Sequence, residues 1–370
     1  MKNYPVNQPL IDGNEKKYLI DCIESGWISS DGPFVEQFEN LFSNFVDCNY
    51  GVSVCNGTAA LETALYAVGI KEGDEIIMPS FTIISCAIAA LRLNAVPVLV
   101  DVKQNWNMDV SQIEKKITNK TKAIMAVHMY GHPAEMNTIK KIADKYNLYV
   151  VEDASQVHGA KYNGKSCGSI GDVATFSFYA NKIVTTGEGG MVTTSNKVFF
   201  ERAKSYRNLC FKKERRFYHD ELGENFRMTN MQAALGVAQM ERVNEFIEKK
   251  IHIGRKYAEC LSSIPYIRIQ QQSKGSKMVY WMYCVELEEK HNKKASIVIE
   301  ELGKNGIGTR PFFLGLHQQP VLINKGLFLN EDYPITEKAS EYGFYLPSSL
   351  SLKDKDVEYI VNELKKILGF

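Results

Sequence analysis

Short runs rich in β-branched residues alternate with segments of helical periodicity between residues 49 and 194. The runs are GVSVCN, GDEIIMP, VPVLVDV, KAIMAVHMY and LYVVEDA, and the helical segments include TAALETALYAVGI, FTIISCAIAALRL and MNTIKKIADKYN. Strands that alternate with helices in this way form a mainly parallel sheet covered by helices. The pattern therefore predicts an α/β fold.

Further segments follow this alternation. The runs VATFSFY and GGMVTTS add strands to the same sheet, and a helical pattern from about residue 229 to 262 leads out of it. VYWMYCVEL, SIVIEELGKNG and IGTRPFF then predict a strand, a helix and a strand. We expect a large domain over residues 1–245 and a smaller C-terminal α+β domain over residues 246–370.

Charge and composition limit the partners of the chain. With 45% hydrophobic and 24% charged residues, the 370-residue chain is an ordinary globular protein. Lys and Arg total 44 against 43 Asp and Glu, so no bulk field favours nucleic acid or an anionic membrane. We expect a small-molecule partner, with no nucleic acid and no membrane.

Cysteine usage and the N-terminus indicate the compartment. The eight cysteines include no CxxC pair and no zinc-module spacing, and the first residues contain no apolar signal segment. His128 and His132 lie four residues apart, but Gly131 and Pro133 exclude a regular helix between them, so no metal site is expected. The sequence favours a cytoplasmic protein without a metal.

A candidate phosphate site lies in Asn56-Gly-Thr-Ala-Ala60, between a predicted strand and a predicted helix. Gly57 lets the backbone approach a ligand, Thr58 can cap the helix, and the free N–H groups of a helix start suit a phosphate dianion. A capped helix start with no ligand is the alternative.

A carboxylate and a lysine follow at other strand ends. Asp153 ends the strand LYVVED, where it either accepts a proton from a heterocyclic cation or caps a turn. Lys182 lies five residues after Ser177, before the glycine-rich GEGG, and is either a surface lysine or a desolvated nucleophile that forms Schiff bases. GEGG does not match GxGxxG, so a nicotinamide fingerprint is absent.

These groups together match one cofactor. A phosphate cradle, a carboxylate, a hydroxyl and a nucleophilic lysine are what pyridoxal 5'-phosphate (PLP) requires for its phosphate, ring nitrogen and aldehyde.

Long ordered segments resemble a known family. GWISSDGPFVEQFE, SVCNGTAALETAL, GDEIIMPSFT, VVEDASQVHGA, GSIGDVATFSFY, NKIVTTGEGGMVTT and ENFRMTNMQAALG resemble the fold type I sugar aminotransferases of the DegT/DnrJ/EryC1/StrS group. The resemblance runs over nearly the whole chain. It implies a fold type I PLP enzyme.

The resemblance also implies roles for individual residues. Lys182 would hold PLP covalently and then shuttle protons, Asp153 would keep the ring nitrogen protonated, and Gln156 would lie beside the PLP hydroxyl. A related dehydratase carries histidine where Lys182 stands, so the lysine favours amine transfer.

Phosphate contacts and a shared site are implied in the same way. Gly57, Thr58 and Ser177 match phosphate contacts, and Asn225 matches an asparagine that reaches in from a second subunit. A homodimer with shared active sites is therefore expected.

Substrate contacts rest on the resemblance alone. His158, Arg310 and His317 match segments near the substrate, with structural hydrogen bonding as the alternative role. Many relatives carry an aromatic residue that stacks on PLP at the position of Ile83, and Ile83 is expected to pack on the ring as an apolar lid.

The implied reaction transfers the amino group of L-glutamate to C4 of a nucleotide-linked 4-keto-6-deoxy sugar. GDP-4-keto-6-deoxymannose is the preferred acceptor, with a dTDP- or UDP-linked analogue as the alternative. A PLP-binding regulatory or structural protein without catalysis is the alternative of another kind.

Overall fold

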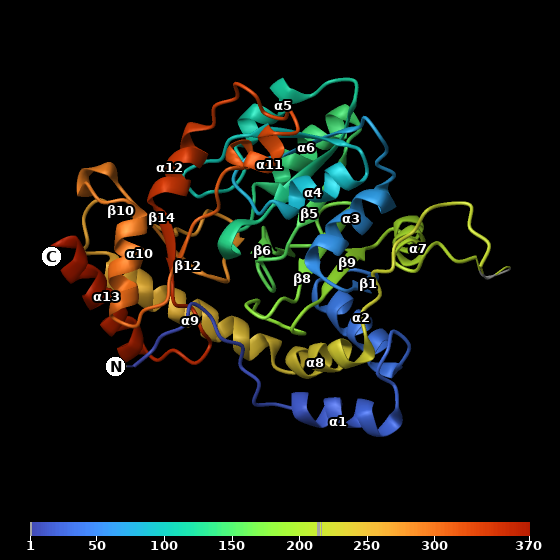
Figure 1. Cartoon of the computed structure of the whole chain (residues 1–370), viewed down its shortest axis with the longest axis horizontal. Helices are drawn as coiled ribbons and strands as arrows, with labels where there is room; N and C mark the ends of the chain where they lie inside the picture. The colour runs from blue at the N-terminus through green and yellow to red at the C-terminus, as the bar shows by residue number, and fades with distance from the viewer. Residues whose placement is uncertain (1, 213–214, 216) are drawn as a thin grey trace.

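The computed structural model describes residues 2–212, 215 and 217–370. A seven-stranded sheet in the order β1-β9-β8-β5-β4-β2-β3 forms the centre of the larger part (Figure 1). Its strands are β1 (Tyr50–Val54), β2 (Glu75–Pro79), β3 (Val96–Val100), β4 (Thr121–Val127), β5 (Tyr149–Asp153), β8 (Val173–Ser177) and β9 (Gly190–Thr194). Neighbours from β3 to β8 pair in parallel, and β9 pairs antiparallel to both β8 and β1. The predicted α/β fold with a mainly parallel sheet is confirmed.

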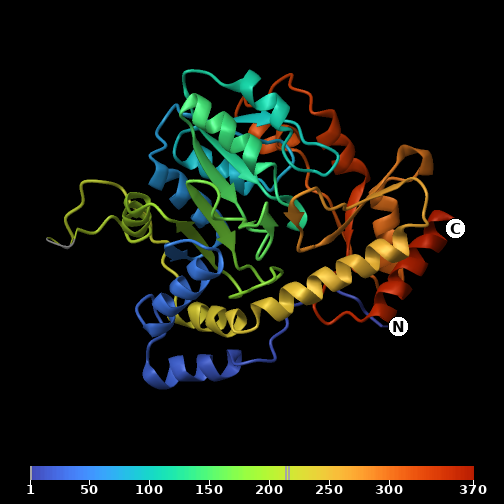
Figure 2. The same ribbon diagram turned by 180° about the vertical axis from the view of Figure 1, so that it is seen from behind.

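Helices cover both faces of this sheet (Figures 1 and 2). One face packs against α3 (Gly57–Val68) and α4 (Ser85–Arg92), and the other packs against α2 (Pro33–Phe45) and α6 (Met136–Tyr146). Alternate residues of a strand point to opposite faces. In β8, Ser177 therefore faces the start of α3, while Phe176 packs edge-on against Phe42 of α2, with ring centroids 4.7 Å apart.

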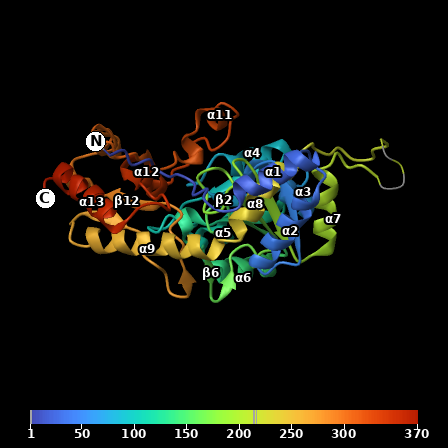
Figure 3. The ribbon, with the colours of Figure 1, turned by 90° about the horizontal axis from the view of Figure 1, so that it is seen from below.

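The helical pattern near residue 240 contains a break that the sequence analysis did not predict. Instead of one helix over residues 229–262, the chain forms α8 (Asn230–Met240) and α9 (Val243–Leu261). Arg242 leaves the helical dihedrals with φ −119°, and its guanidinium pairs with Asp12 and Glu245. The break lets α9 leave the large sheet and run toward the C-terminal part of the chain (Figure 3).

A second, four-stranded sheet forms the smaller part, in the order β10-β12-β14-β13. Its strands are β10 (Ile267–Ile269), β12 (Tyr283–Leu287), β13 (Arg310–Pro311) and β14 (Gly343–Leu346), with α10 (Ala295–Lys304) and α13 (Asp354–Leu368) packed nearby. The predicted strand, helix and strand correspond to β12, α10 and β13. The domain boundary at residue 245 falls just inside α9 and stays a prediction.

The remaining elements are short or peripheral. They are α1 (Glu15–Ser25), α5 (Ile113–Lys116), α7 (Lys197–Tyr206), α11 (Pro320–Ile323), α12 (Pro334–Tyr342), β6 (Lys161–Tyr162), β7 (Lys165–Ser166) and β11 (Ser276–Lys277). Among the described residues, no helix combines the length and apolarity needed to cross a membrane.

Candidate active site

A cavity of about 570 Å³ opens at the carboxyl ends of β5 and β8. Ligands bind at this edge in open α/β sheets because loops and helix N-termini converge there. The cavity is lined by six of the predicted site residues, namely Gly57, Thr58, Asp153, Gln156, Ser177 and Lys182. Residues more than a hundred positions apart in the chain therefore meet in one place.

The start of α3 forms the predicted phosphate cradle. Asn56, and not Thr58, caps this helix, because its side chain accepts the N–H of Ala59 at 2.9 Å. A Cβ atom on Gly57 would lie 2.8 Å from the Cβ of Ser177, so only glycine permits this approach. Thr58 instead donates its hydroxyl to Oγ of Ser85 at 2.9 Å. The first-turn N–H groups and the helix dipole are suited to a phosphate.

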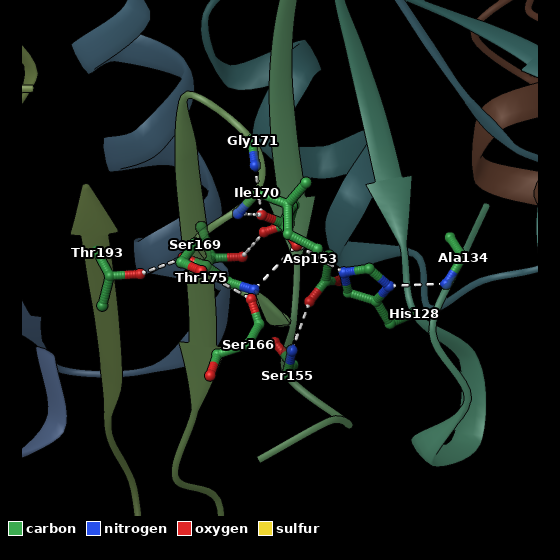
Figure 4. Close-up of polar contacts among 12 residues, drawn as sticks. His128, Ala134, Asp153, Ser155, Ser166, Ser169, Ile170, Gly171, Thr175 and Thr193 are labelled. Carbon is green, nitrogen blue, oxygen red and sulfur yellow. Dashed lines mark hydrogen bonds and ion pairs between the residues drawn. The ribbon is translucent and has the colours of Figure 1, made fainter. Parts of the chain in front are cut away.

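Asp153 provides the buried carboxylate of the cavity. It faces α4, where its Oδ2 lies 3.4 Å from the thiol of Cys86, and its Oδ1 accepts the N–H of Ser155 at 3.1 Å (Figure 4). Neither contact neutralises the carboxylate with a cation. The carboxylate is therefore suited to pair with a protonated ring nitrogen.

Glu152 precedes Asp153 and points to the opposite face of the sheet. It accepts the N–H groups of Ile170 and Gly171 and pairs with Nε2 of His128 at 2.9 Å. Burial alone would raise the pKa of Glu152, but the hydrogen bonds from His128 and the backbone outweigh it and lower that pKa. Since Nδ1 of His128 accepts the N–H of Ala134, Nε2 carries the proton donated to Glu152 (Figure 4). Glu152 is therefore a structural residue.

Lys182 lies partly buried between Asp153 and Trp281. Its Nζ is 3.8 Å from the centroid of the Trp281 ring. Burial lowers the pKa of Lys182 from 10.5 to about 8, and the Asp153 charge opposes this shift. A larger share of the amine is thus neutral at physiological pH than in an exposed lysine, as nucleophilic attack on an aldehyde requires.

Gln156 is oriented by the backbone of a neighbouring loop. Its Oε1 accepts the N–H of Tyr130 at 2.6 Å, which leaves the amide NH2 as the group offered to a ligand. A donor at this position is suited to the hydroxyl oxygen of the PLP ring. This geometry supports the role expected for Gln156.

His158 lies outside the cavity lining, on the other face of the sheet. Its ring is completely buried among the rings of Phe42, Phe176 and Phe178. Burial lowers the pKa of His158 to about 3, and the nearby Lys182 charge adds to this effect. The chain turns after Gln156 and directs the His158 ring away from the cavity. This position gives no support to a contact between His158 and the substrate.

The other predicted residues also lie apart from the cavity lining within this chain. Arg310 and Asn225 are exposed, and His317 is buried and pairs with Glu337 at 3.1 Å. The roles expected for them in substrate binding and across subunits stay predictions.

Five aromatic residues line the cavity within the described part of the chain, and none was predicted as a site residue; Tyr179 and Phe226 belong to the larger part. Trp281, Phe313 and Tyr345 line it from the C-terminal part of the chain. Trp281 and Phe313 stand in predicted strands, where an aromatic side chain is ordinarily a core residue. Tyr345 stands in β14, a strand that the sequence analysis did not predict. Ile83 lines the cavity with 41% of its surface exposed, whereas Phe81 is completely buried elsewhere. The aromatic wall is therefore contributed by segments distant in sequence.

The residues present fit PLP. The cavity combines a helix start where a Cβ would clash, a carboxylate that makes no salt bridge with any described residue, and a lysine of lowered pKa. This combination on a mainly parallel sheet defines a PLP-dependent enzyme of fold type I.

Comparisons with known proteins agree with the site. Residues 9–365 match the DegT/DnrJ/EryC1/StrS aminotransferase family. The chain is 41% identical to a GDP-perosamine synthase of Escherichia coli O157:H7 over 99% of both chains, and 37% identical to that of Vibrio cholerae over 98% of both. Helicobacter pylori PseC, an aminotransferase involved in pseudoaminic acid biosynthesis, superposes with a TM-score of 0.94 at 25% identity over 99% of both chains.

The chain belongs to the DegT/DnrJ/EryC1/StrS aminotransferase family. It is a PLP-dependent aminotransferase, as the sequence analysis predicted.

Proposed function

We propose that this enzyme transfers the amino group of L-glutamate to C4 of GDP-4-keto-6-deoxymannose, giving GDP-perosamine. The end-to-end match to GDP-perosamine synthases of two bacteria, at 41% and 37% identity, is the observation that supports this acceptor. A dTDP- or UDP-linked 4-keto-6-deoxy sugar is the alternative acceptor.

The residues of the cavity divide the work of the reaction. Bound PLP would supply an aldehyde carbon, which carries the amino group between the two half reactions, and a ring that accepts electrons. The start of α3 and Ser177 would bind its phosphate, and the Asp153 carboxylate would hold a proton on its ring nitrogen. Lys182, with a pKa of about 8, exchanges protons readily near neutral pH and would move them at the carbon that gains or loses the amine.

The aromatic wall would exclude water from the reacting atoms. Trp281, Phe313 and Tyr345 face the same cavity as Lys182. A sugar enters there more readily than a large apolar ligand because Asn181, Ser85 and Glu188 also line it and offer polar atoms.

The working form proposed for the enzyme is a cytoplasmic homodimer. Asn225 is exposed in this chain, and Trp27 and Ile28 leave about half of their surfaces uncovered, at 50% and 51%. Exposed apolar side chains of this kind favour subunit contact, and Asn225 would then reach the cavity of the partner. Light scattering of the purified protein measures the expected dimer mass.

One experiment tests the acceptor. The pure protein is incubated with PLP, L-glutamate and, separately, GDP-, dTDP- and UDP-linked 4-keto-6-deoxy sugars, and products are followed by mass and NMR. A C4-amino product from the GDP sugar alone supports the proposal. Turnover of only a dTDP or UDP sugar retains the aminotransferase and replaces the substrate.

The same mixture separates catalysis from a silent regulatory protein. Glutamate alone changes the visible absorbance of bound PLP in an active enzyme, whereas a silent protein shows no change. A missing change with glutamate, together with no amino sugar from any acceptor, contradicts the proposed reaction.

A further inference from the structure

A second buried lysine lies behind the active site. Lys250 projects from α9, retains 1% of its surface exposed and has no carboxylate partner among the described residues. Its Nζ donates to the carbonyl oxygen of Trp281 at 2.9 Å and to that of Ser348. Burying a lysine amine against neutral carbonyls alone is costly, so this arrangement calls for an explanation.

The two carbonyls lie at the ends of neighbouring strands. Trp281 precedes β12 and Ser348 follows β14, and these strands pair antiparallel. Lys250 therefore holds together the end of the second sheet that faces the cavity. One of these two hydrogen bonds is made to Trp281, which lines the active-site cavity.

Trp281 transmits the contact to the reactive lysine. Its Nε1 donates to the carbonyl of Asn181 at 2.7 Å, and its ring lies 3.8 Å from the Nζ of Lys182. Trp281 thus contacts both the backbone carbonyl of Asn181 and the side-chain amine of the adjacent Lys182.

A second set of hydrogen bonds connects Lys250 to the carbonyl of Asn181. Ser348 N donates to the carbonyl of Val6 at 2.8 Å, and the side chain of the adjacent Asn7 donates to the carbonyl of Asn181. The N-terminal segment therefore links Ser348 to Asn181, the residue before Lys182. Both acceptors of Lys250 are connected through hydrogen bonds to Asn181.

We propose that Lys250 is a positioning residue, which holds Trp281 and Ser348 so that the Trp281 ring and the Asn181 carbonyl fix Lys182 in the cavity. The inference rests on the proposed function only in taking Lys182 as the reacting lysine. The contact acts before any substrate binds, since every group in it belongs to the chain.

The test compares Lys250→Met with Lys249→Met. Methionine has a similar length but donates no hydrogen bond, and Lys249 is the neighbour on α9 that pairs with Glu245 at the surface. The first readout is the pKa of Lys182 in the full chain freed of PLP, measured by competitive acetylation across pH with peptide mass spectrometry.

We expect Lys250→Met to let water reach Lys182 and to raise its pKa by about half a unit or more, and Lys249→Met to leave it unchanged. In the PLP-loaded enzyme the glutamate half reaction slows by about tenfold, with KM for glutamate within about twofold of wild type. A merely structural role lowers stability and leaves the Lys182 pKa in place.

Two further variants keep the proposal testable. If Lys250→Met lacks a cooperative melting transition, Lys250→Gln replaces it, because its amide keeps N–H donors on a side chain one atom shorter than that of lysine. Trp281→Phe removes the indole N–H and part of the ring that lies against Lys182. It is expected to change the Lys182 pKa and the half reaction without adding to the effect of Lys250→Met in the double variant.

Two results overturn the inference. One is a folded Lys250 variant whose Lys182 pKa and half-reaction rate equal those of wild type. The other is full additivity of the Lys250 and Trp281 effects. Failure of the proposed sugar reaction is distinguishable from both, because the acetylation readout needs neither PLP nor sugar.

Discussion

Lys182 and Lys250 are two lysines withdrawn from water in different surroundings. Burial lowers the pKa of Lys182 to about 8 and that of Lys250 to about 7. Lys182 faces a cavity of about 570 Å³ and the Asp153 carboxylate, whereas Lys250 is enclosed between α9 and two backbone carbonyls. Desolvation makes an amine less basic in both places, but only the cavity leaves room for a reaction partner.

The strongest test of this contrast removes the reactive amine. We expect Lys182→Ala to slow the glutamate half reaction by about 10³-fold or more, because no other lysine among the described residues lines the cavity to move the proton. Rapid-mixing absorbance of bound PLP measures the rate, and Lys249→Ala serves as the control. A rate within about tenfold of wild type would place the reactive lysine elsewhere.

The two lysines also differ in that Lys182 has the carboxylate of Asp153 nearby, whereas Lys250 has no carboxylate partner among the described residues. Asp153→Asn keeps the shape of the side chain and is expected to slow the same half reaction by about 10²-fold, because an uncharged amide does not hold a proton on the ring nitrogen. Asp144→Asn, at an exposed surface position of α6, is the matched control. Equal rates for the two variants would remove Asp153 from the mechanism.

A smaller effect is expected where the backbone approaches the cofactor. Gly57→Ala would bring a Cβ to 2.8 Å from that of Ser177, so α3 must shift and PLP affinity is expected to fall about tenfold. Gly303→Ala in α10 meets no neighbouring atom and provides the control. Titration of the protein freed of PLP measures both affinities, and unchanged binding by Gly57→Ala contradicts the phosphate cradle.

The smallest expected effect is a stability difference that depends on pH. Lys250 has a pKa of about 7 when folded against 10.5 ordinarily, so the unfolded chain binds more protons between these values. The stability of wild type relative to Lys250→Met therefore rises with pH, by about 2 kcal/mol between about pH 7 and pH 9. Thermal melts across this range measure the difference, and a constant difference would mean that Lys250 is not desolvated in solution.

Much of the site could be predicted because each residue has a local signal. Gly57 follows a strand and begins a helix, Asp153 ends a strand, and Lys182 precedes a glycine-rich turn. Parallel strands bring such ends to one edge, so these residues met as predicted. The resemblance added Gln156 and the family. The family is confirmed by the comparisons, and the role of Gln156 stays a prediction.

Other residues had no local signal that distinguished them. His158 stands two residues after Gln156, yet the chain turns it into the aromatic core, and Trp281 has the appearance of an ordinary strand residue. Arg242, at the break between α8 and α9, pairs with Asp12, which lies far away in the sequence. Contacts of this kind are set by packing between distant segments.

The alternation of strands and helices, the glycines of the turns and the positions of Asp153 and Lys182 are local properties. They determined the α/β sheet and predicted the edge at which the candidate cofactor site lies. The lowered pKa of Lys182, the opposite directions of Glu152 and Asp153 and the contacts of Lys250 with Trp281 arose only from folding. They depend on which side chains exclude water from which others, and segments far apart in the chain supply those side chains.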